Sequence, residues 1–384
     1  MARVRTGGED AGVKVEQSGV PLSAPYLDEH EEQLVLEVLR SGRLSLGPTI
    51  DAFEELVAAK VGAPYAAAVS SGTTGLHLLC VTAGVSAGDE VITTPYSFAA
   101  SANCFIYEGG VPVFADIDRA TLNMDPRAVE AAVTPRTKAI VAVDIYGYPC
   151  ELDELRAIAD RHGLALIQDS CEALGAEYRG ATIGSHGPSA VFAFYPNKQI
   201  TTGEGGIVTT HSEEEWRLLR SLRNQGRGDE GGWLEHVRLG FNYRMSDVTA
   251  ALGLGQVEKL EEILPLRAQV AARYDELLGG IDGVELPLAD DVDHVRSWFV
   301  YVVALPDNDA RERVIATFER EGIGYNRYLP SIHLQPYMRE RYGFRPGMCP
   351  VSEDLSSRTL ALPFFTGLER DAQERVADVL RSAL

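Results

Sequence analysis

One lysine, Lys198, has neighbours that suit covalent chemistry. It follows an apolar, strand-like run at residues 192–194 and precedes a glycine-rich turn at residues 203–206. Such a setting can desolvate an amine and hold it in one position, and a rigid, desolvated amine is suited to forming a Schiff base with a carbonyl group. Most lysines are solvated surface charges, so the assignment depends on what else the chain provides.

An acid upstream, Asp169, is the natural partner for this lysine. It closes a largely apolar run at residues 165–169, and a buried parallel strand would present it at its C-terminal end, where open α/β sheets bind ligands. The alternative is a helix N-cap, because Glu172 three residues later completes the pattern of a capping box. The pair suggests pyridoxal phosphate, with Asp169 on the ring nitrogen and Lys198 on the aldehyde. A carboxylate about 4 Å from a pyridinium gains roughly 4 kcal/mol at an effective dielectric near 20, which keeps the nitrogen protonated.

A phosphate site is indicated by the turn Ser-Ser-Gly-Thr-Thr-Gly at residues 70–75. It lies between an apolar strand-like run and an apolar helix start, so backbone N–H groups would surround the positive end of a helix dipole. Many such turns only connect a strand to a helix. The turn has neither the Gly-Lys-Ser/Thr ending of a P-loop nor a G-x-G-x-x-G pattern. Phe98, in a turn after the strand-like run 90–94, could stack on a pyridine ring or simply pack in the core.

Six motifs follow one another in a recognisable order: SSGTTGLHLL, GDEVITTPYSFAASAN, DIYGYP, IQDSCEALGA, FAFYPNKQITTGEGG and LGFNYRMSDVTAALGLGQ. With them the chain resembles, from about residue 21 to its C-terminus, the nucleotide-sugar aminotransferases of the DegT/StrS type, which are fold-type I pyridoxal phosphate enzymes. The resemblance implies these cofactor contacts: Gly72 and Thr73 at the phosphate, Phe98 stacked on the ring, Asp169 at the ring nitrogen, Glu172 beside the cofactor, Lys198 as the catalytic Schiff-base lysine, and Asn242 reaching the phosphate of the neighbouring subunit's cofactor.

The resemblance also implies a homodimer with shared active sites. The alternative for Asn242 is a turn residue that bonds to its own backbone. Family members often carry serine where this chain has Ala193, so the phosphate is expected to lose one donor or to recruit water.

The implied reaction is a ping-pong transamination from an amino-acid donor, L-glutamate, to a keto-sugar nucleotide, with Lys198 moving the proton. The turn ITTGEGG at residues 200–206 resembles members that aminate C4 of a 4-keto-6-deoxy sugar. Three alternatives stay open: a C3-specific aminotransferase, a sugar dehydratase, and a regulator that binds the cofactor without turnover. The dehydratases of this type replace the lysine with histidine, so Lys198 counts against that alternative.

An anionic nucleotide sugar needs a local basic patch, because the chain has a formal net charge of −21. Candidates for substrate contacts are Arg223, Arg227, Arg244 and Arg327, with Tyr328 and His333 from the motif YLPSIHLQP. Each arginine could instead belong to a surface or structural ion pair. The same charge opposes non-specific binding to nucleic acid or to an anionic membrane.

The elements that must position these residues alternate in a β-α rhythm. Strand-like runs at residues 111–116, 139–144 and 164–167 enclose helix-like segments at 126–133 and 152–159, which predicts an α/β fold with a mainly parallel central sheet and helices on both faces. A long helical pattern from Asp247 to Leu278 ends at a Gly-Gly pair.

The strand-like run 298–304 and two later helical patterns then predict a smaller α+β domain. The expected division is a flexible N-terminal arm at residues 1–20, a large pyridoxal phosphate domain at 21–255 and a small C-terminal domain at 256–384.

Composition agrees with a large enzyme of more than one core, since 45% of the 384 residues are hydrophobic. No run of 18 apolar residues predicts a membrane span. Five dispersed cysteines suggest neither disulfides nor a zinc site, and the histidines lack metal-ligand spacing, so no metal is expected. These features predict a cytoplasmic enzyme.

Overall fold

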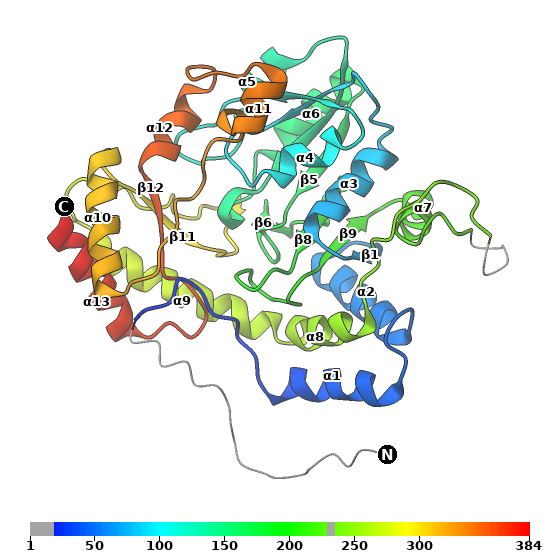
Figure 1. Ribbon diagram of the computed structural model, residues 1–384, viewed down its shortest axis with the longest axis horizontal. Coiled ribbons are helices and arrows are strands. Elements are labelled where there is room, and N and C mark those ends of the chain that lie inside the picture. The colour runs from blue at the N-terminus through cyan, green and yellow to red at the C-terminus, as the bar shows by residue number, and fades with distance from the viewer. Residues whose placement is uncertain (1–18, 229–234) are drawn as a thin grey trace.

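A computed structural model describes residues 19–228 and 235–384 (Figure 1). The predicted N-terminal arm lies outside the described residues up to residue 18. The strands are β1 (Tyr65–Val69), β2 (Glu90–Thr93), β3 (Val111–Phe114), β4 (Thr137–Val143), β5 (Ala165–Asp169), β6 (Glu177–Tyr178), β7 (Ala181–Thr182), β8 (Ser189–Ala193), β9 (Gly206–Thr210), β10 (His294–Val295), β11 (Tyr301–Ala304) and β12 (Thr359–Leu362).

The α-helices are α1 (Glu29–Ser41), α2 (Pro48–Val61), α3 (Gly72–Thr82), α4 (Ala100–Ile106), α5 (Pro126–Ala132), α6 (Leu152–His162), α7 (Glu213–Arg223), α8 (Asp247–Glu258), α9 (Leu260–Leu278), α10 (Asn308–Glu321), α11 (Pro336–Tyr342), α12 (Pro350–Arg358) and α13 (Arg370–Ala383). Two 3-10 turns are η1 (Ile145–Gly147) and η2 (Ile332–Leu334). None of the described helices is long and apolar enough to cross a membrane.

The large sheet has seven strands in the order β1-β9-β8-β5-β4-β2-β3. The pairs β2/β3, β2/β4, β4/β5 and β5/β8 are parallel, and β9 is antiparallel to both of its neighbours. The prediction of a mainly parallel α/β sheet is therefore confirmed. Parallel strands point their carboxyl ends to one edge, which is where β5 delivers Asp169.

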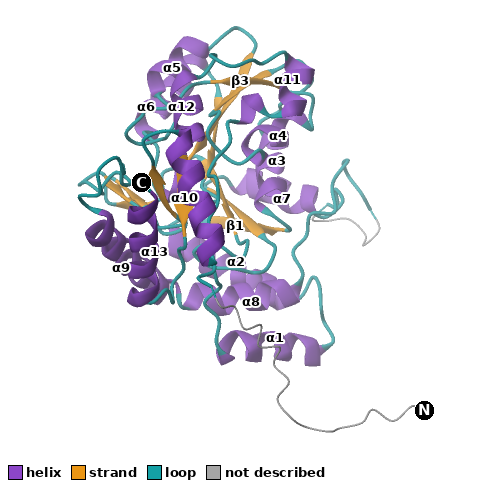
Figure 2. Ribbon diagram, turned by 60° about the vertical axis from the view of Figure 1, so that its left-hand side comes forward, coloured by secondary structure: helices purple, strands orange, loops and turns teal. Residues whose placement is uncertain are grey.

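Helices cover both faces of this sheet (Figure 2). Side chains alternate between the faces along each strand: in β1, Ala66 and Ala68 belong to one buried cluster and Ala67 and Val69 to the other. Residues of α2, α5, α6 and α8 complete the first cluster, and residues of α3, α4, α7 and α11 complete the second. Burial on both faces explains why these strands are continuous apolar runs in the sequence.

A further core gathers the C-terminal elements. The two-stranded sheet β11-β12 packs with α9, α10 and α13, and Val20 joins this cluster from the start of the described chain. The predicted helix over 247–278 is two helices that meet at Lys259, and α9 ends before the expected Gly279. The boundary predicted at residue 255 falls inside α8, and α11 packs on the core of the large sheet. The division into domains stays a prediction.

Candidate active site

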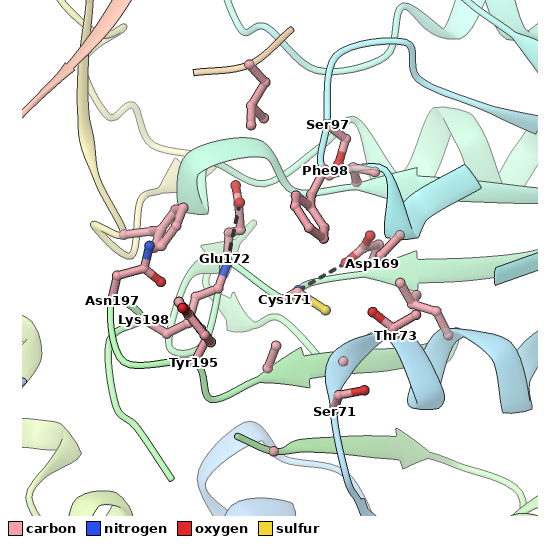
Figure 3. Close-up of a pocket in the computed structure, with 18 of the residues that line it drawn as sticks. Ser71, Thr73, Ser97, Phe98, Asp169, Cys171, Glu172, Tyr195, Asn197 and Lys198 are labelled. Atoms are coloured by element: carbon pink, nitrogen blue, oxygen red, sulfur yellow. Dashed lines mark hydrogen bonds and ion pairs between the residues drawn. The ribbon is translucent and has the colours of Figure 1, made fainter. Parts of the chain in front are cut away.

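A cavity of about 500 Å³ lies at the carboxyl edge of the large sheet (Figure 3). Its walls come from the end of β5, the first turn of α3, the turn before α4 and the loop after β8, with further side chains from the C-terminal part of the chain. It brings together Gly72, Thr73, Phe98, Asp169, Glu172 and Lys198. Six of the seven predicted cofactor contacts thus line one cavity.

Asp169 is buried at the end of β5, where two groups donate to its carboxylate. Ser101 Oγ donates to Oδ2 at 2.7 Å, and the Cys171 backbone N–H donates to Oδ1 at 3.3 Å. No helix follows β5, because the next element in this part of the chain is the short strand β6. The helix-cap alternative for Asp169 and Glu172 is therefore wrong, and the carboxylate of Asp169 is available to the cavity.

Lys198 lies on the other side of the cavity from Asp169 (Figure 3). Its Nζ donates to Glu172 Oε1 at 3.4 Å and lies 3.8 Å from the centroid of the Phe299 ring. The other oxygen of Glu172 accepts from the Tyr146 backbone N–H at 2.8 Å. Burial raises the pKa of Glu172, and the neighbouring Lys198 opposes that rise. The carboxylate and the aromatic ring together hold the amine in one place.

The N-terminus of α3 forms the floor of the cavity. Ser71 caps the helix, because its Oγ accepts from the Thr74 N–H at 3.2 Å and Thr74 Oγ1 accepts from the Ser71 N–H at 3.1 Å. A Cβ placed on Gly72 would lie 2.8 Å from both Ala193 Cβ and Cys171 Sγ. Glycine is therefore required at the point where a ligand can approach the positive end of the helix.

These residues fit pyridoxal phosphate. The cavity has an acid on one side, an amine on the other and a helix N-terminus at its floor, and the Phe98 ring is directed into the same space (Figure 3). Phe98 is 66% exposed in the single chain, which is unusual for a phenylalanine and suits a ring that a ligand will cover.

The fold separates the candidates for substrate contacts from one another. Tyr328 lines the cavity, and its hydroxyl accepts from Asn197 Nδ2 at 3.2 Å. Arg327 forms an exposed ion pair with Glu312, 2.7 Å apart. His333 is completely buried and lies 3.0 Å from Glu353. Neither Arg327 nor His333 lines the cavity, so the expectation that they contact substrate finds no support in their positions.

The basic patch that the sequence suggests is also divided. Arg223 is buried and pairs with Glu54, which identifies it as a structural cation. Arg244 lines a separate cavity of about 80 Å³ together with Arg220 and Arg223, and it donates to Asn224 Oδ1 at 2.9 Å. Burial, reinforced by neighbouring arginines, lowers the pKa of Arg244. The cavity of a single chain thus gains no arginine from this group.

Asn242 is exposed and does not line the cavity of its own chain. It pairs with Asn224 in an isolated antiparallel bridge. Its side chain is therefore not placed to bind a ligand within its own subunit.

Several residues that line the cavity or contact its acid were not predicted from the sequence. Ser97 and Ser101 lie four positions apart around the start of α4, and that spacing is the only signal that could have connected them. Phe299 and Asn326 come from the C-terminal part of the chain, and nothing in their local sequence indicates contact with Lys198. The described residues hold no group of three or more His, Cys, Asp or Glu side chains suited to a metal ion.

Comparison with known proteins gives a consistent result. The model of the DegT/DnrJ/EryC1/StrS aminotransferase family matches residues 25–381. The spore coat polysaccharide biosynthesis protein SpsC of Bacillus subtilis is 37% identical over 375 residues, covering 94% of this chain and 96% of that protein.

Among solved structures, S. venezuelae DesV is 32% identical with a TM-score of 0.89, covering 95% of this chain and 98% of that one. Helicobacter pylori PseC, an aminotransferase involved in the biosynthesis of pseudoaminic acid, is 28% identical with a TM-score of 0.90, covering 95% and 99%.

Proposed function

The chain belongs to the DegT/DnrJ/EryC1/StrS aminotransferase family, and within that family of pyridoxal phosphate-dependent sugar aminotransferases we propose that it transfers an amino group from L-glutamate to C4 of a nucleotide-linked 4-keto-6-deoxyhexose. The observation that carries the chemistry is the presence of Asp169 and Lys198 in one cavity with the Phe98 ring and the N-terminus of α3. The turn ITTGEGG supports C4 as the position.

When bound, pyridoxal phosphate supplies an aldehyde that exchanges for the amino group and a ring that withdraws electrons. The residues of the chain supply the rest. Lys198 would hold the aldehyde end of the cofactor, and its Nζ would be the base that moves a proton from the α-carbon of the donor to the aldehyde carbon. Lys198 lies on a short turn that holds its amine in one place, so the amine acts on the donor at a high effective concentration.

Asp169 holds the proton on the ring nitrogen, because a buried carboxylate stabilises the positive charge. Phe98 covers one face of the ring, and Gly72 and Thr73 bind the phosphate at the helix N-terminus. Glu172 positions the Lys198 amine through their 3.4 Å contact. Of the substrate candidates, Tyr328 has the strongest support because it shares this cavity.

We further propose a cytoplasmic homodimer in which Asn242 reaches the cofactor phosphate of the partner subunit. The support is that Asn242 is exposed outside its own cavity. Arg244, two residues away and without a carboxylate hydrogen-bond partner among the described contacts, is the best candidate to bring positive charge to an anionic substrate from across the interface. The five free cysteines suit a reducing compartment.

A turnover panel tests the substrate. The purified enzyme is supplied with pyridoxal phosphate, L-glutamate and, in turn, 4-keto and 3-keto sugars linked to dTDP, UDP or GDP, and the products are identified by mass spectrometry and NMR. The expected result is amination at C4 of one 4-keto-6-deoxy sugar nucleotide. Amination of 3-keto sugars alone would overturn the position, and loss of a hydroxyl without amination would identify a dehydratase. Cofactor binding with no turnover of any sugar or amino acid would favour the regulator.

A further inference from the structure

Two serine hydroxyl groups form a hydrogen-bond relay that ends on the carboxylate of Asp169. Ser101 Oγ lies 2.7 Å from Asp169 Oδ2, and Ser97 Oγ lies 2.7 Å from Ser101 Oγ. All three side chains are buried. Ser101 lies in the first turn of α4, whereas Ser97 precedes this helix and lines the cavity next to Phe98. The relay therefore connects the aromatic wall of the cavity to its acid.

The number of hydrogens on each group determines which hydroxyl donates and which accepts in this relay. A serine hydroxyl has a single hydrogen, and an ionised carboxylate has none. The hydrogen of Ser101 therefore points to Asp169, and Ser101 Oγ must accept from the hydroxyl of Ser97. The relay runs from Ser97 through Ser101 to Asp169, and each donated hydrogen bond strengthens the next. If a proton were on Oδ2 of Asp169 instead, both hydrogen bonds of the relay would have to reverse.

This direction has a chemical consequence. A hydrogen bond donated to a carboxylate stabilises its ionised form and weakens its hold on a proton. We propose that Ser101, oriented by Ser97, is a positioning residue that keeps the proton shared by Asp169 and the cofactor on the ring nitrogen rather than on the carboxylate. The proposal rests on the proposed function, because it requires Asp169 to face the ring nitrogen.

The test measures where this proton lies. The protein and its variants are loaded with pyridoxal phosphate carrying ¹⁵N in the ring, and the ¹⁵N chemical shift is compared with the pyridinium and neutral pyridine limits. In the native protein we expect a shift close to the pyridinium limit. Ser101→Ala should move the shift towards neutral pyridine, because losing a hydrogen bond to a charged group changes the ratio of the two forms by roughly ten-fold or more.

Three further variants make the result specific. Ser97→Ala leaves Ser101 in place but removes its donor, so it should move the shift in the same direction by a smaller amount, and Ser101→Thr should restore the native shift. Ser352→Ala is the matched control, because Ser352 is completely buried in a separate hydroxyl cluster, 2.9 Å from Ser331 Oγ. It should leave the shift unchanged.

The outcomes separate this inference from the proposed function. Asp169→Asn must give neutral pyridine, and if it does not, or if the native protein already shows neutral pyridine, the proposed role of Asp169 fails. If those two samples behave as expected while Ser101→Ala and Ser97→Ala both keep the native shift, the relay proposal alone is overturned. Should Ser101→Ala fail to fold, the shift of Ser97→Ala decides the question.

Discussion

Phe98→Ala should weaken cofactor binding while leaving the fold almost unchanged. Burying a whole phenylalanine side chain stabilises by about 1.5–3 kcal/mol, and Phe98 is 66% exposed, so about two thirds of that amount is available to a ligand. A ring stacked on one face would realise about half of this, roughly 0.5–1 kcal/mol, and the stacking geometry adds about 0.5–1.5 kcal/mol. The sum of about 1–2.5 kcal/mol corresponds to a 5- to 60-fold rise in Kd.

The assay is equilibrium binding of pyridoxal phosphate to the cofactor-free protein, with thermal unfolding measured in parallel. Unfolding should change by less than about 1 kcal/mol, because most of the ring is exposed before the ligand binds. The control is Tyr107→Ala, which removes a 59% exposed aromatic from the far end of α4 and should leave the Kd nearly unchanged. An unaltered Kd in Phe98→Ala, or an equal loss in Tyr107→Ala, would refute the stacking role.

Three other perturbations give separate expectations. Lys198→Ala should abolish turnover and the absorption of the lysine-bound cofactor without unfolding the protein, since it removes a reactive amine rather than core volume; retained turnover measured by product release would exclude Lys198 as the catalytic lysine. Mixing the inactive Lys198→Ala protein with a protein disabled at Asn242 should restore activity to about a quarter of the native value. Random subunit exchange makes half of the dimers hybrid, and each hybrid has one intact site. No recovery, despite exchange seen by native mass spectrometry, would show that Asn242 does not act across the interface. The hydrogen bond that His30 Nε2 donates to the Glu258 carboxylate raises the pKa of His30 above 6.5. This pair therefore stabilises the fold below that pH, and its contribution is lost as the pH rises through the raised pKa. Glu258→Gln should lower the melting temperature at about pH 6 and not at about pH 9, and an equal loss at both pH values would contradict the assignment.

The sequence predicted those parts of the molecule that depend on local pattern. Buried strands had to be apolar on both faces, so β3, β4 and β5 were recognisable. The Gly/Ser/Thr turn at residues 70–75 before an apolar run indicated the start of α3. Asp169 was found because it closes an apolar run, and Lys198 because it lies between an apolar run and a glycine-rich turn. Their roles in catalysis stay predictions that the variants above test.

Contacts between segments far apart in the sequence could not be predicted from the sequence. Phe299 lies 3.8 Å from the Lys198 amine, but a phenylalanine in a strand-like run looks the same whether it packs in a core or lines a cavity. The side chains of His333 and Arg327 were plausible substrate contacts, yet Glu353 and Glu312 are their partners. Such contacts form only once the fold brings the two side chains together. The contact of Ser101 with Asp169 could not be predicted, because a serine in a short helix has no distinctive sequence pattern.

The central claim is that this cavity transaminates, and a half-reaction tests it most directly. The protein loaded with pyridoxal phosphate is mixed with a panel of amino acids that includes L-glutamate, without any sugar, and both the cofactor absorption and the released 2-oxo acid are recorded. We expect that L-glutamate removes the absorption of the lysine-bound cofactor, that about one equivalent of 2-oxoglutarate forms per active site, and that Lys198→Ala releases none. A native protein that binds the cofactor at Lys198 but converts no amino acid would contradict it.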